Sequence, residues 1–244
     1  EFQPRIVFAD QKKTWRKRTK DLIPTDKGSL KVRFLDTMVF AIIKTLAYPV
    51  FRYYLGARLL GKENIPRRGP FILIVNHEGY FDSFFLIALL KRKVAFFAKN
   101  TEFKSGFFRW ILRVFRAIPV RRYEIDPSVI RNAIKLLSQG HPVGIFIEGE
   151  RTWDGEFLPP KRGVVKFLLR ANVPIVPCLI RGSFECMPRW EHRIRRTPVK
   201  MVLGKPFKLR EKEGDLEEIG TLLMKKIKEI TSRRVGTFGR LQLK

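Results

Sequence analysis

The sequence predicts an α/β protein: a layered domain with a mainly parallel sheet flanked by helices, preceded by an N-terminal amphipathic two-helix motif suited to binding a membrane surface. Short apolar runs alternate with segments of helical periodicity from about residue 65 onward, as they do in βαβ units. Before them, a basic segment leads into an apolar, helix-periodic one. We therefore divide the chain into residues 1–60, the basic segment and helical anchor, and residues 61–244, the α/β domain.

The N-terminal prediction depends on the periodicity of residues 35–60. Apolar side chains recur there at spacings of three and four, as on one face of a helix, and Pro49 should kink or split that helix. The charged residues would cluster on the opposite side: Arg33, Asp36, Lys44, Arg52 and Arg58. Such a segment can lie in a bilayer interface, and the alternative is a helix packed on its own domain.

The strands are expected at continuous apolar runs, because parallel strands buried on both faces have no polar side. These runs are residues 71–75, 94–98, 117–120, 143–147, 175–180 and 199–203. Helices are expected between and after them, at residues 79–90, 105–115, 127–139, 164–170 and 217–232. The helix over 127–139 has the clearest ends, since Asp126 suits an N-cap, Pro127 the first helical position and Gly140 the terminus.

Composition limits the class of protein. A chain of 244 residues that is 45% hydrophobic can bury a sizeable core, which excludes intrinsic disorder as its main state. Fifty Lys and Arg against 23 Asp and Glu leave a net charge of +27, so we expect an anionic partner: nucleic acid, acidic lipid or a phosphorylated metabolite. Two cysteines are too few for a disulfide framework. Because Lys44, Arg52 and Arg58 interrupt the most apolar stretch, no membrane-spanning helix is expected.

One of the three histidines stands where an active-site side chain can be exposed. His77 directly follows the apolar run 71–75, and Asp82 falls in the first turn of the next expected helix. A carboxylate bonded to one imidazole nitrogen would leave the other nitrogen to act as a base. The alternative is a capping aspartate beside an incidental histidine. No histidine pair has metal-ligand spacing, so no metal site is predicted.

A second polar cluster follows the apolar run 143–147. Glu148, Gly149 and Arg151 could form a tight turn in which the glycine allows an unusual backbone angle and the arginine offers a forked donor to phosphate. A surface turn held by salt bridges explains these residues equally well. If the strand ends converge, Arg122 and Lys161 would add positive charge.

Four ordered motifs resemble those of the glycerolipid acyltransferase family, most closely the bacterial 1-acylglycerol-3-phosphate O-acyltransferases. The first is Asn76-His77-Glu-Gly-Tyr-Phe-Asp82 and the third is Phe146-Ile-Glu148-Gly149-Glu-Arg151. The second runs from Ala98-Lys99-Asn-Thr-Glu-Phe-Lys104 to Ala117-Ile-Pro-Val-Arg-Arg122, and the fourth is Val173-Pro174-Ile-Val-Pro177. The resemblance covers about Ile65 to Phe207.

The resemblance implies an enzyme that acylates the sn-2 hydroxyl of lysophosphatidic acid and makes phosphatidic acid. His77 would be the base and Asp82 would orient it. Phosphate would be held by Glu148, Gly149, Arg151, Arg122, Lys99 and Lys161, and Pro174 and Pro177 would form a wall of the site. The donor would be acyl carrier protein or coenzyme A thioester, with no cofactor, and the enzyme would sit on the cytoplasmic face of the cell inner membrane by monotopic attachment to anionic phospholipid.

Departures from the family pattern leave the headgroup of the acceptor open. Gly79 stands where many members have serine, Ile147 and Glu150 replace proline and threonine, and Arg121 replaces a common aspartate. Glycerol 3-phosphate or another lysophospholipid is therefore an alternative acceptor. A basic nucleic-acid binding protein is a distant alternative, since no known nucleic-acid motif is present and the apolar face over 35–60 would have no explanation.

Overall fold

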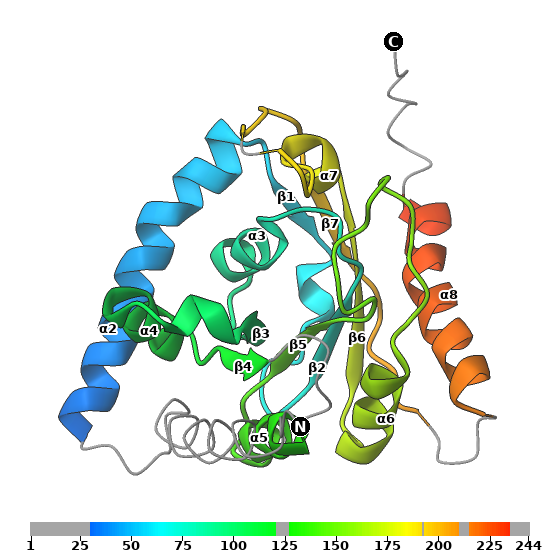
Figure 1. The fold of residues 1–244 in the computed structure, drawn as a ribbon, viewed down its shortest axis with the longest axis horizontal. Helices are drawn as coiled ribbons and strands as arrows, with labels where there is room; N and C mark the ends of the chain where they lie inside the picture. The colour runs from blue at the N-terminus through cyan, green and yellow to red at the C-terminus, as the bar shows by residue number, and fades with distance from the viewer. Residues whose placement is uncertain (1–29, 121–126, 192, 210–214, 235–244) are drawn as a thin grey trace, which may run out of the picture.

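The computed structural model describes residues 30–120, 127–191, 193–209 and 215–234. Seven strands form one sheet in the order β1-β7-β6-β2-β5-β3-β4 (Figure 1). Their bounds are β1 Arg58–Leu60, β2 Ile72–Val75, β3 Ala95–Lys99, β4 Ile118–Val120, β5 Val143–Phe146, β6 Ile175–Arg181 and β7 Lys200–Leu203. Neighbouring strands are parallel except for β6 and β7, so the predicted mainly parallel sheet is confirmed.

Helices cover both faces of the sheet, as the alternating pattern predicts. Side chains of α5 (Pro127–Ser138), α6 (Arg162–Ala171) and α8 (Leu216–Arg234) pack on one face, against Ile72 and Ile74 of β2. Side chains of α3 (Asp82–Leu89) pack on the other face, against Leu73 and Val75. All four residues of β2 are fully buried, which explains why this central strand is a continuous apolar run.

The shorter elements lie at the margins of these layers. Helix α4 (Gly106–Val114) follows the short helix η3 (Asn100–Phe103) and precedes β4, the edge strand, while η2 (Lys62–Asn64) and α7 (Ser183–Cys186) lie in loops. Figure 1 shows α4 on the same side of the molecule as α2, and α8 on the opposite side of the sheet.

The N-terminal segment differs from the expectation. Helix α2 (Leu30–Pro49) continues without a break into a five-residue π-helical stretch, η1 (Val50–Tyr54), so Pro49 neither splits nor folds back this helix. One helix of the expected two-helix motif is thus present, and residues 1–29 lie outside the described part of the chain. Residues 58–60, expected as the end of this helix, instead form β1, which pairs with β7.

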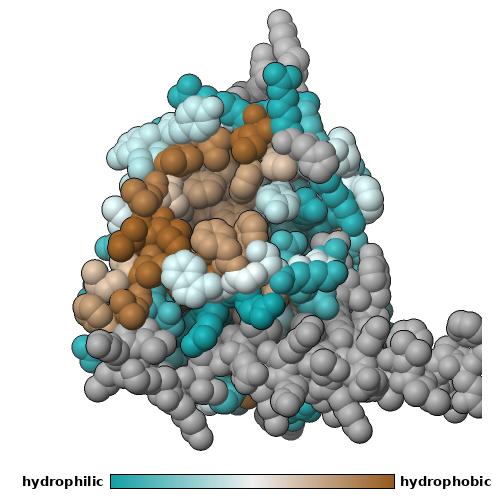
Figure 2. Space-filling view, turned by 60° about the vertical axis from the view of Figure 1, so that its left-hand side comes forward, coloured by the Kyte–Doolittle hydropathy of each residue, from teal (hydrophilic) through white to brown (hydrophobic). Residues whose placement is uncertain are grey.

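The polar side of α2 faces the protein and its apolar side faces outward. The ammonium of Lys44 donates to the carbonyl oxygen of Leu90, and the ring of Phe40 packs edge-on against Phe115 with centroids 5.3 Å apart. The outward stripe consists of Phe34, Leu35, Met38, Ile42, Leu46, Val50, Tyr53 and Tyr54. Apolar side chains form a band along this side of the molecule, beside a hollow (Figure 2).

Residues Phe34–Tyr54 are long and apolar enough to cross a membrane, judged by length and composition alone. The sequence had led us to expect no such segment, because the charged residues interrupt it. An 18-residue window holds no more than two of them, so the mean hydropathy of the segment remains 1.5. The contacts of Lys44 and Phe40 nevertheless hold the helix along the domain.

A substitution of Gly144 in β5 tests how closely the side chain of Phe96 packs against this strand. A β-carbon there would lie 2.3 Å from the ring of Phe96, which is itself buried. Gly144→Ala is therefore expected to lower the free energy of unfolding by about 1–3 kcal/mol, measured by urea denaturation. Gly106→Ala is the control, because its added methyl group would meet no atom within 4 Å. Equal stability of the two variants would contradict this packing.

Candidate active site

His77 and Asp82 meet at the end of the central strand. His77 lies two residues beyond the end of β2, and Asp82 is the first residue of α3. The chain turns sharply between them, so His77 Nδ1 lies 2.8 Å from Asp82 Oδ2. Asp82 is fully buried, whereas 19% of the His77 side chain remains exposed. The carboxylate is thus enclosed while the imidazole stays accessible.

The surroundings of this pair fix the tautomer and the plane of the imidazole. Asp82 Oδ2 also accepts hydrogen bonds from the backbone N–H groups of Glu78, at 2.8 Å, and Gly79, at 3.0 Å. Because three contacts converge on this oxygen as acceptor, Nδ1 of His77 is the donor and Nε2 is left as an acceptor. The ring stacks on Phe146, with centroids 3.8 Å apart and planes 13° from parallel.

Asn76 ties this turn to the neighbouring strand. Its side-chain oxygen accepts from the N–H of Ile180 at 2.7 Å, and its amide nitrogen donates to the carbonyl oxygen of Ile180 at 3.0 Å. The side chain therefore continues the pairing of β2 with β6 beyond the last residue of β2. It holds the backbone from which His77 projects.

Glu78 and Arg181 form an ion pair beside the turn. Arg181 Nη1 donates to Glu78 Oε1 at 2.9 Å and to the carbonyl oxygen of Gly155 at 3.3 Å, and its guanidinium lies 4.4 Å from the ring centroid of Phe157. Burial raises the pKa of Glu78 to about 8, against the lowering effect of Arg181. Arg181 thus joins the residue after His77 to the loop after β5.

Glu148 holds the same two loops together through backbone contacts. Its Oε1 accepts from the N–H of His77 at 3.4 Å and its Oε2 from the N–H of Leu158 at 3.2 Å. The residue is buried, and burial raises the pKa of its carboxyl to about 7. Both oxygens thereby accept from backbone N–H groups, which suits a residue that positions the loops, and its role in phosphate binding stays a prediction.

The tight turn predicted at Gly149 is present. Gly149 has φ of +71°, and a β-carbon there would lie 2.7 Å from Cγ of Lys161. Glu150, which stands where the family has threonine, binds Nζ of Lys161 at 3.1 Å and Nη1 of Arg189 at 3.4 Å. The ammonium of Lys161 has three donors and its side chain is 57% exposed, so it can contact a phosphate while it stays in this ion pair.

Arg151 lies close to the His77 turn. The N–H of the next residue, Thr152, donates to the carbonyl oxygen of His77 at 2.9 Å, and the guanidinium of Arg151 lies 5.4 Å from the ring centroid of Tyr80. Lys99 is exposed and is the last residue of β3. It lies at the carboxyl end of the parallel strands, as does His77. Arg122 lies outside the described residues.

The two prolines expected as a site wall belong to the sheet instead. The carbonyl of Pro174 accepts from the N–H of Ile72 at the start of β2, the end opposite to His77. Pro177 is the register partner of Ile74, and a β-carbon on Gly204 would lie 2.8 Å from its Cγ. Its side chain therefore shares the face covered by α8, because register partners in parallel strands point the same way.

Sequence reasoning missed Phe146, Glu78, Arg181 and Arg189. Phe146 carried a usable signal, since it ends the strand that precedes Glu148. Arg181 ends β6 and so reaches the same edge of the sheet, but nothing in the sequence pairs it with Glu78, 103 positions earlier. Arg189 donates to the carbonyl of Arg151 and stacks on Trp153 from a loop without a recognisable motif.

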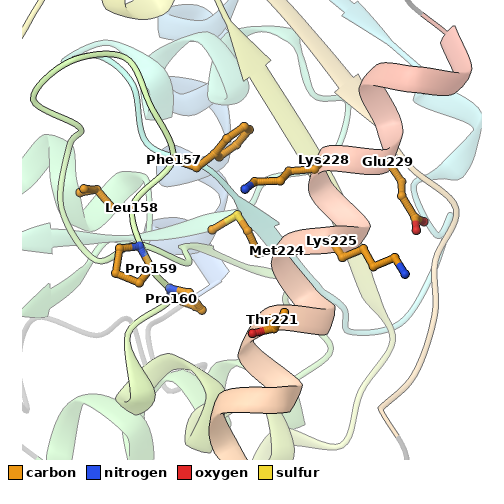
Figure 3. A pocket seen from close by; sticks show the side chains of 9 residues that line it. All are labelled: Phe157, Leu158, Pro159, Pro160, Thr221, Met224, Lys225, Lys228 and Glu229. Atoms are coloured by element: carbon orange, nitrogen blue, oxygen red, sulfur yellow. The ribbon is translucent and has the colours of Figure 1, made fainter.

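A pocket of about 660 Å³ lies on another part of the surface, between residues 157–160 and one side of α8 (Figure 3). Phe157, Leu158, Pro159, Pro160 and Met224 form its apolar lining, and Lys225 and Lys228 bring positive charge. None of the predicted site residues lines it. Within the described ranges, no three His, Cys, Asp or Glu side chains are grouped to bind a metal.

Glu148→Gln tests whether this carboxylate acts through backbone contacts. The amide nitrogen of glutamine would face the N–H of either His77 or Leu158, which would lose its acceptor, so we expect the melting temperature to fall by several degrees. Circular dichroism during heating measures it. Glu156→Gln, an exposed change in the same loop, serves as control, and an unchanged melting temperature for Glu148→Gln would refute the positioning role.

Comparison with known proteins identifies the family. An acyltransferase family model matches residues 57–181, a range that contains His77, Asp82, Glu148 and Arg151. A 1-acyl-sn-glycerol-3-phosphate acyltransferase of Bacillus subtilis is 31% identical over 153 residues, which are 62% of this chain and 74% of that protein. A chloroplastic protein of the same description from Brassica napus is 26% identical over 164 residues, 66% of this chain. The chain spans 46% of the length of that plant relative.

Among solved structures, the 1-acyl-sn-glycerophosphate (LPA) acyltransferase PlsC of Thermotoga maritima is similar with a TM-score of 0.70 and 22% sequence identity. The similarity covers 87% of this chain and 86% of that one, so the two share a fold. The family match, the Bacillus relative and the paired His77 and Asp82 agree with one another. The chain therefore belongs to the acyltransferase family.

Proposed function

We propose that this chain transfers a fatty acyl group from an acyl thioester to the sn-2 hydroxyl of lysophosphatidic acid and so makes phosphatidic acid. The 2.8 Å contact between His77 Nδ1 and Asp82 Oδ2 carries the proposal, because it leaves Nε2 exposed as a general base at the edge of the sheet. The descriptions of the Bacillus and Brassica relatives name this acceptor.

The chemistry needs one base that later acts as an acid. Nε2 of His77 takes the proton of the acceptor hydroxyl while the hydroxyl oxygen attacks the thioester carbonyl, which gives a tetrahedral intermediate. Asp82 stabilises the imidazolium that forms, without itself taking the proton. Collapse of the intermediate breaks the carbon–sulfur bond, and the imidazolium returns the proton to the departing thiolate. The products are the new ester and a free thiol.

Arg151 is the group best placed to hold the phosphate of the acceptor. Its forked donors match phosphate oxygens, and its backbone is joined to the His77 turn through the contact of Thr152 with His77. Lys99 and Lys161 would assist, with Gly149 providing the turn that presents Arg151. Arg122, expected in the same role, remains a proposal from the sequence.

The donor is acyl carrier protein or coenzyme A thioester, and no cofactor takes part in the proposed steps. In this proposal the enzyme lies on the cytoplasmic face of the cell inner membrane by monotopic attachment. Of the expected division into an anchor of residues 1–60 and an acyltransferase domain of residues 61–244, β1 (Arg58–Leu60) belongs to the sheet of the domain, so the anchor ends before Arg58. The outward apolar stripe of α2 and the net charge of +27 support attachment to anionic phospholipid.

Asp82→Asn should lower kcat for lysophosphatidate acylation about 10²- to 10⁴-fold, because the imidazole loses the acceptor that fixes its tautomer. His77→Ala should lower it at least as much. Release of free thiol from acyl-CoA or from acylated acyl carrier protein measures kcat of both variants. Asp215→Asn, at a helix-capping aspartate that asparagine can replace, is the matched control. Near-normal turnover by His77→Ala would refute the base assignment.

Arg151→Ala should raise the KM for lysophosphatidate about tenfold or more and change the KM for the acyl donor little, because the proposed role of its guanidinium is to bind the phosphate of the acceptor. Arg170→Ala, at the end of α6, controls for loss of one positive charge. The same assays with glycerol 3-phosphate test the acceptor. Equal changes in both KM values would show that Arg151 does not bind the acceptor phosphate.

A further inference from the structure

We propose that helix α4 of the catalytic domain is a second membrane contact, which together with the outward stripe of α2 lays one face of the enzyme on an anionic lipid bilayer. The inference rests on the proposed function, since it assumes an acceptor supplied from a membrane. It adds a lipid-binding element outside the N-terminal anchor, formed by Phe107, Phe108 and Trp110.

The outer side of α4 is aromatic, although a helix facing water is normally polar there. The exposed fractions are 66% for Phe107, 56% for Phe108 and 44% for Trp110. The rings cluster, because the centroid of Phe107 lies 6.0 Å from that of Phe108 and 6.3 Å from that of Trp110. The guanidinium of Arg109 turns back, donating through Nε to the carbonyl oxygen of Phe103 at 3.0 Å. The aromatic side chains are thus left outermost.

Helix α4 packs beside α2, through residues that belong neither to the outward stripe of α2 nor to the aromatic cluster of α4. Phe40 of α2 packs edge-on against Phe115, the residue that follows α4, and Lys93 places its ammonium 4.6 Å from the ring centroid of Phe40. The two helices are therefore held together by the domain itself. Neither exposed surface is covered by any other described part of the chain. Together they expose more large apolar side chains than isolated surface residues account for.

The charges around α4 favour a bilayer as the occupant over a second copy of this basic chain. Helix α4 contains no acidic residue, and Lys104, Arg109 and Arg113 accompany its aromatic side chains, with Glu102 as the one nearby acid in η3. Aromatic rings among basic side chains suit the headgroup region of an anionic membrane. Two copies, each with a net charge of +27, would repel one another.

Contact of α2 and α4 with a bilayer would also orient the active site relative to the membrane surface. Helix α3 begins at Asp82 and packs on the same face of the sheet as Tyr48 of α2 and Phe51 of η1. Tyr80 and Phe84, at the start of α3, are about half exposed. Two lipid contacts would fix the tilt of the domain, whereas one helix would leave it free to swing. An acceptor lipid could then reach His77 from the membrane surface.

Fluorescence of Trp110 tests the contact directly in the full chain. Trp15, Trp153 and Trp190 are changed to Phe, so that Trp110 is the sole reporter. Vesicles of phosphatidylcholine and phosphatidylglycerol, seven to three, with or without brominated acyl chains, supply the quencher. The control carries all four Trp→Phe changes and Lys225→Trp, which places the reporter on α8 across the sheet. We expect bromine quenching of Trp110 only. Equal or absent quenching overturns the proposal, as does protection of Trp110 by self-association without vesicles.

Activity measurements separate this inference from the proposed function. Phe107→Ser/Phe108→Ser should reduce turnover of long-chain lysophosphatidate in the same vesicles tenfold or more, while a short-chain, monomeric lysophosphatidate is acylated at the wild-type rate. Phe107→Leu/Phe108→Leu, which keeps apolar side chains, should restore vesicle activity. Loss of both activities with an intact melting temperature overturns the membrane role of α4. Failure of the wild type on both acceptors would instead refute the proposed function.

Discussion

The contact between His77 and Asp82 depends on where the central strand stops. Strand β2 is fully buried and ends at Val75, and beyond it the side chain of Asn76 satisfies the backbone N–H and carbonyl of Ile180 on β6, as a further strand residue would. The chain can then turn within a few residues and begin α3 at Asp82. A fully buried carboxylate is costly unless hydrogen bonds compensate it, and the same turn provides two backbone donors for Oδ2. The imidazole is the third.

Three buried carboxyl groups lie near His77, and each has different hydrogen-bond partners. Asp82 contacts the imidazole, Glu78 is paired with Arg181, and Glu148 accepts from backbone N–H groups. Burial raises the pKa of both Glu78 and Glu148, and the charge of Asp82 adds to each rise. The raised pKa values favour the protonated, neutral forms of Glu78 and Glu148. Asp82, in direct contact with the imidazole, is therefore the carboxylate that stabilises the imidazolium formed during proton transfer.

The sequence predicted the elements of the sheet well because buried parallel strands leave a strong local pattern. The contact between His77 and Asp82 could also be predicted from the sequence, since both residues belong to one turn. The surroundings of Glu148, Pro174 and Pro177 could not be predicted from the sequence, because the direction of a side chain depends on register and on partners distant in sequence. Arg181 is the clearest case: its contact with Glu78 exists only because β6 lies beside β2. Strand β1 was hidden inside an apolar stretch that also suits a helix.

The polarity of α2 links the fold to the place where the reaction occurs. In a water-soluble domain the apolar stripe of a peripheral helix turns inward, but here Lys44 binds the domain and the stripe from Phe34 to Tyr54 faces outward. Helix α4 repeats this inversion with aromatic side chains. Because α2, α3 and the active-site turn share one side of the sheet, the surface that is unfavourable in water lies next to the catalytic residues. An apolar environment on that side would stabilise the enzyme where its lipid substrate is found.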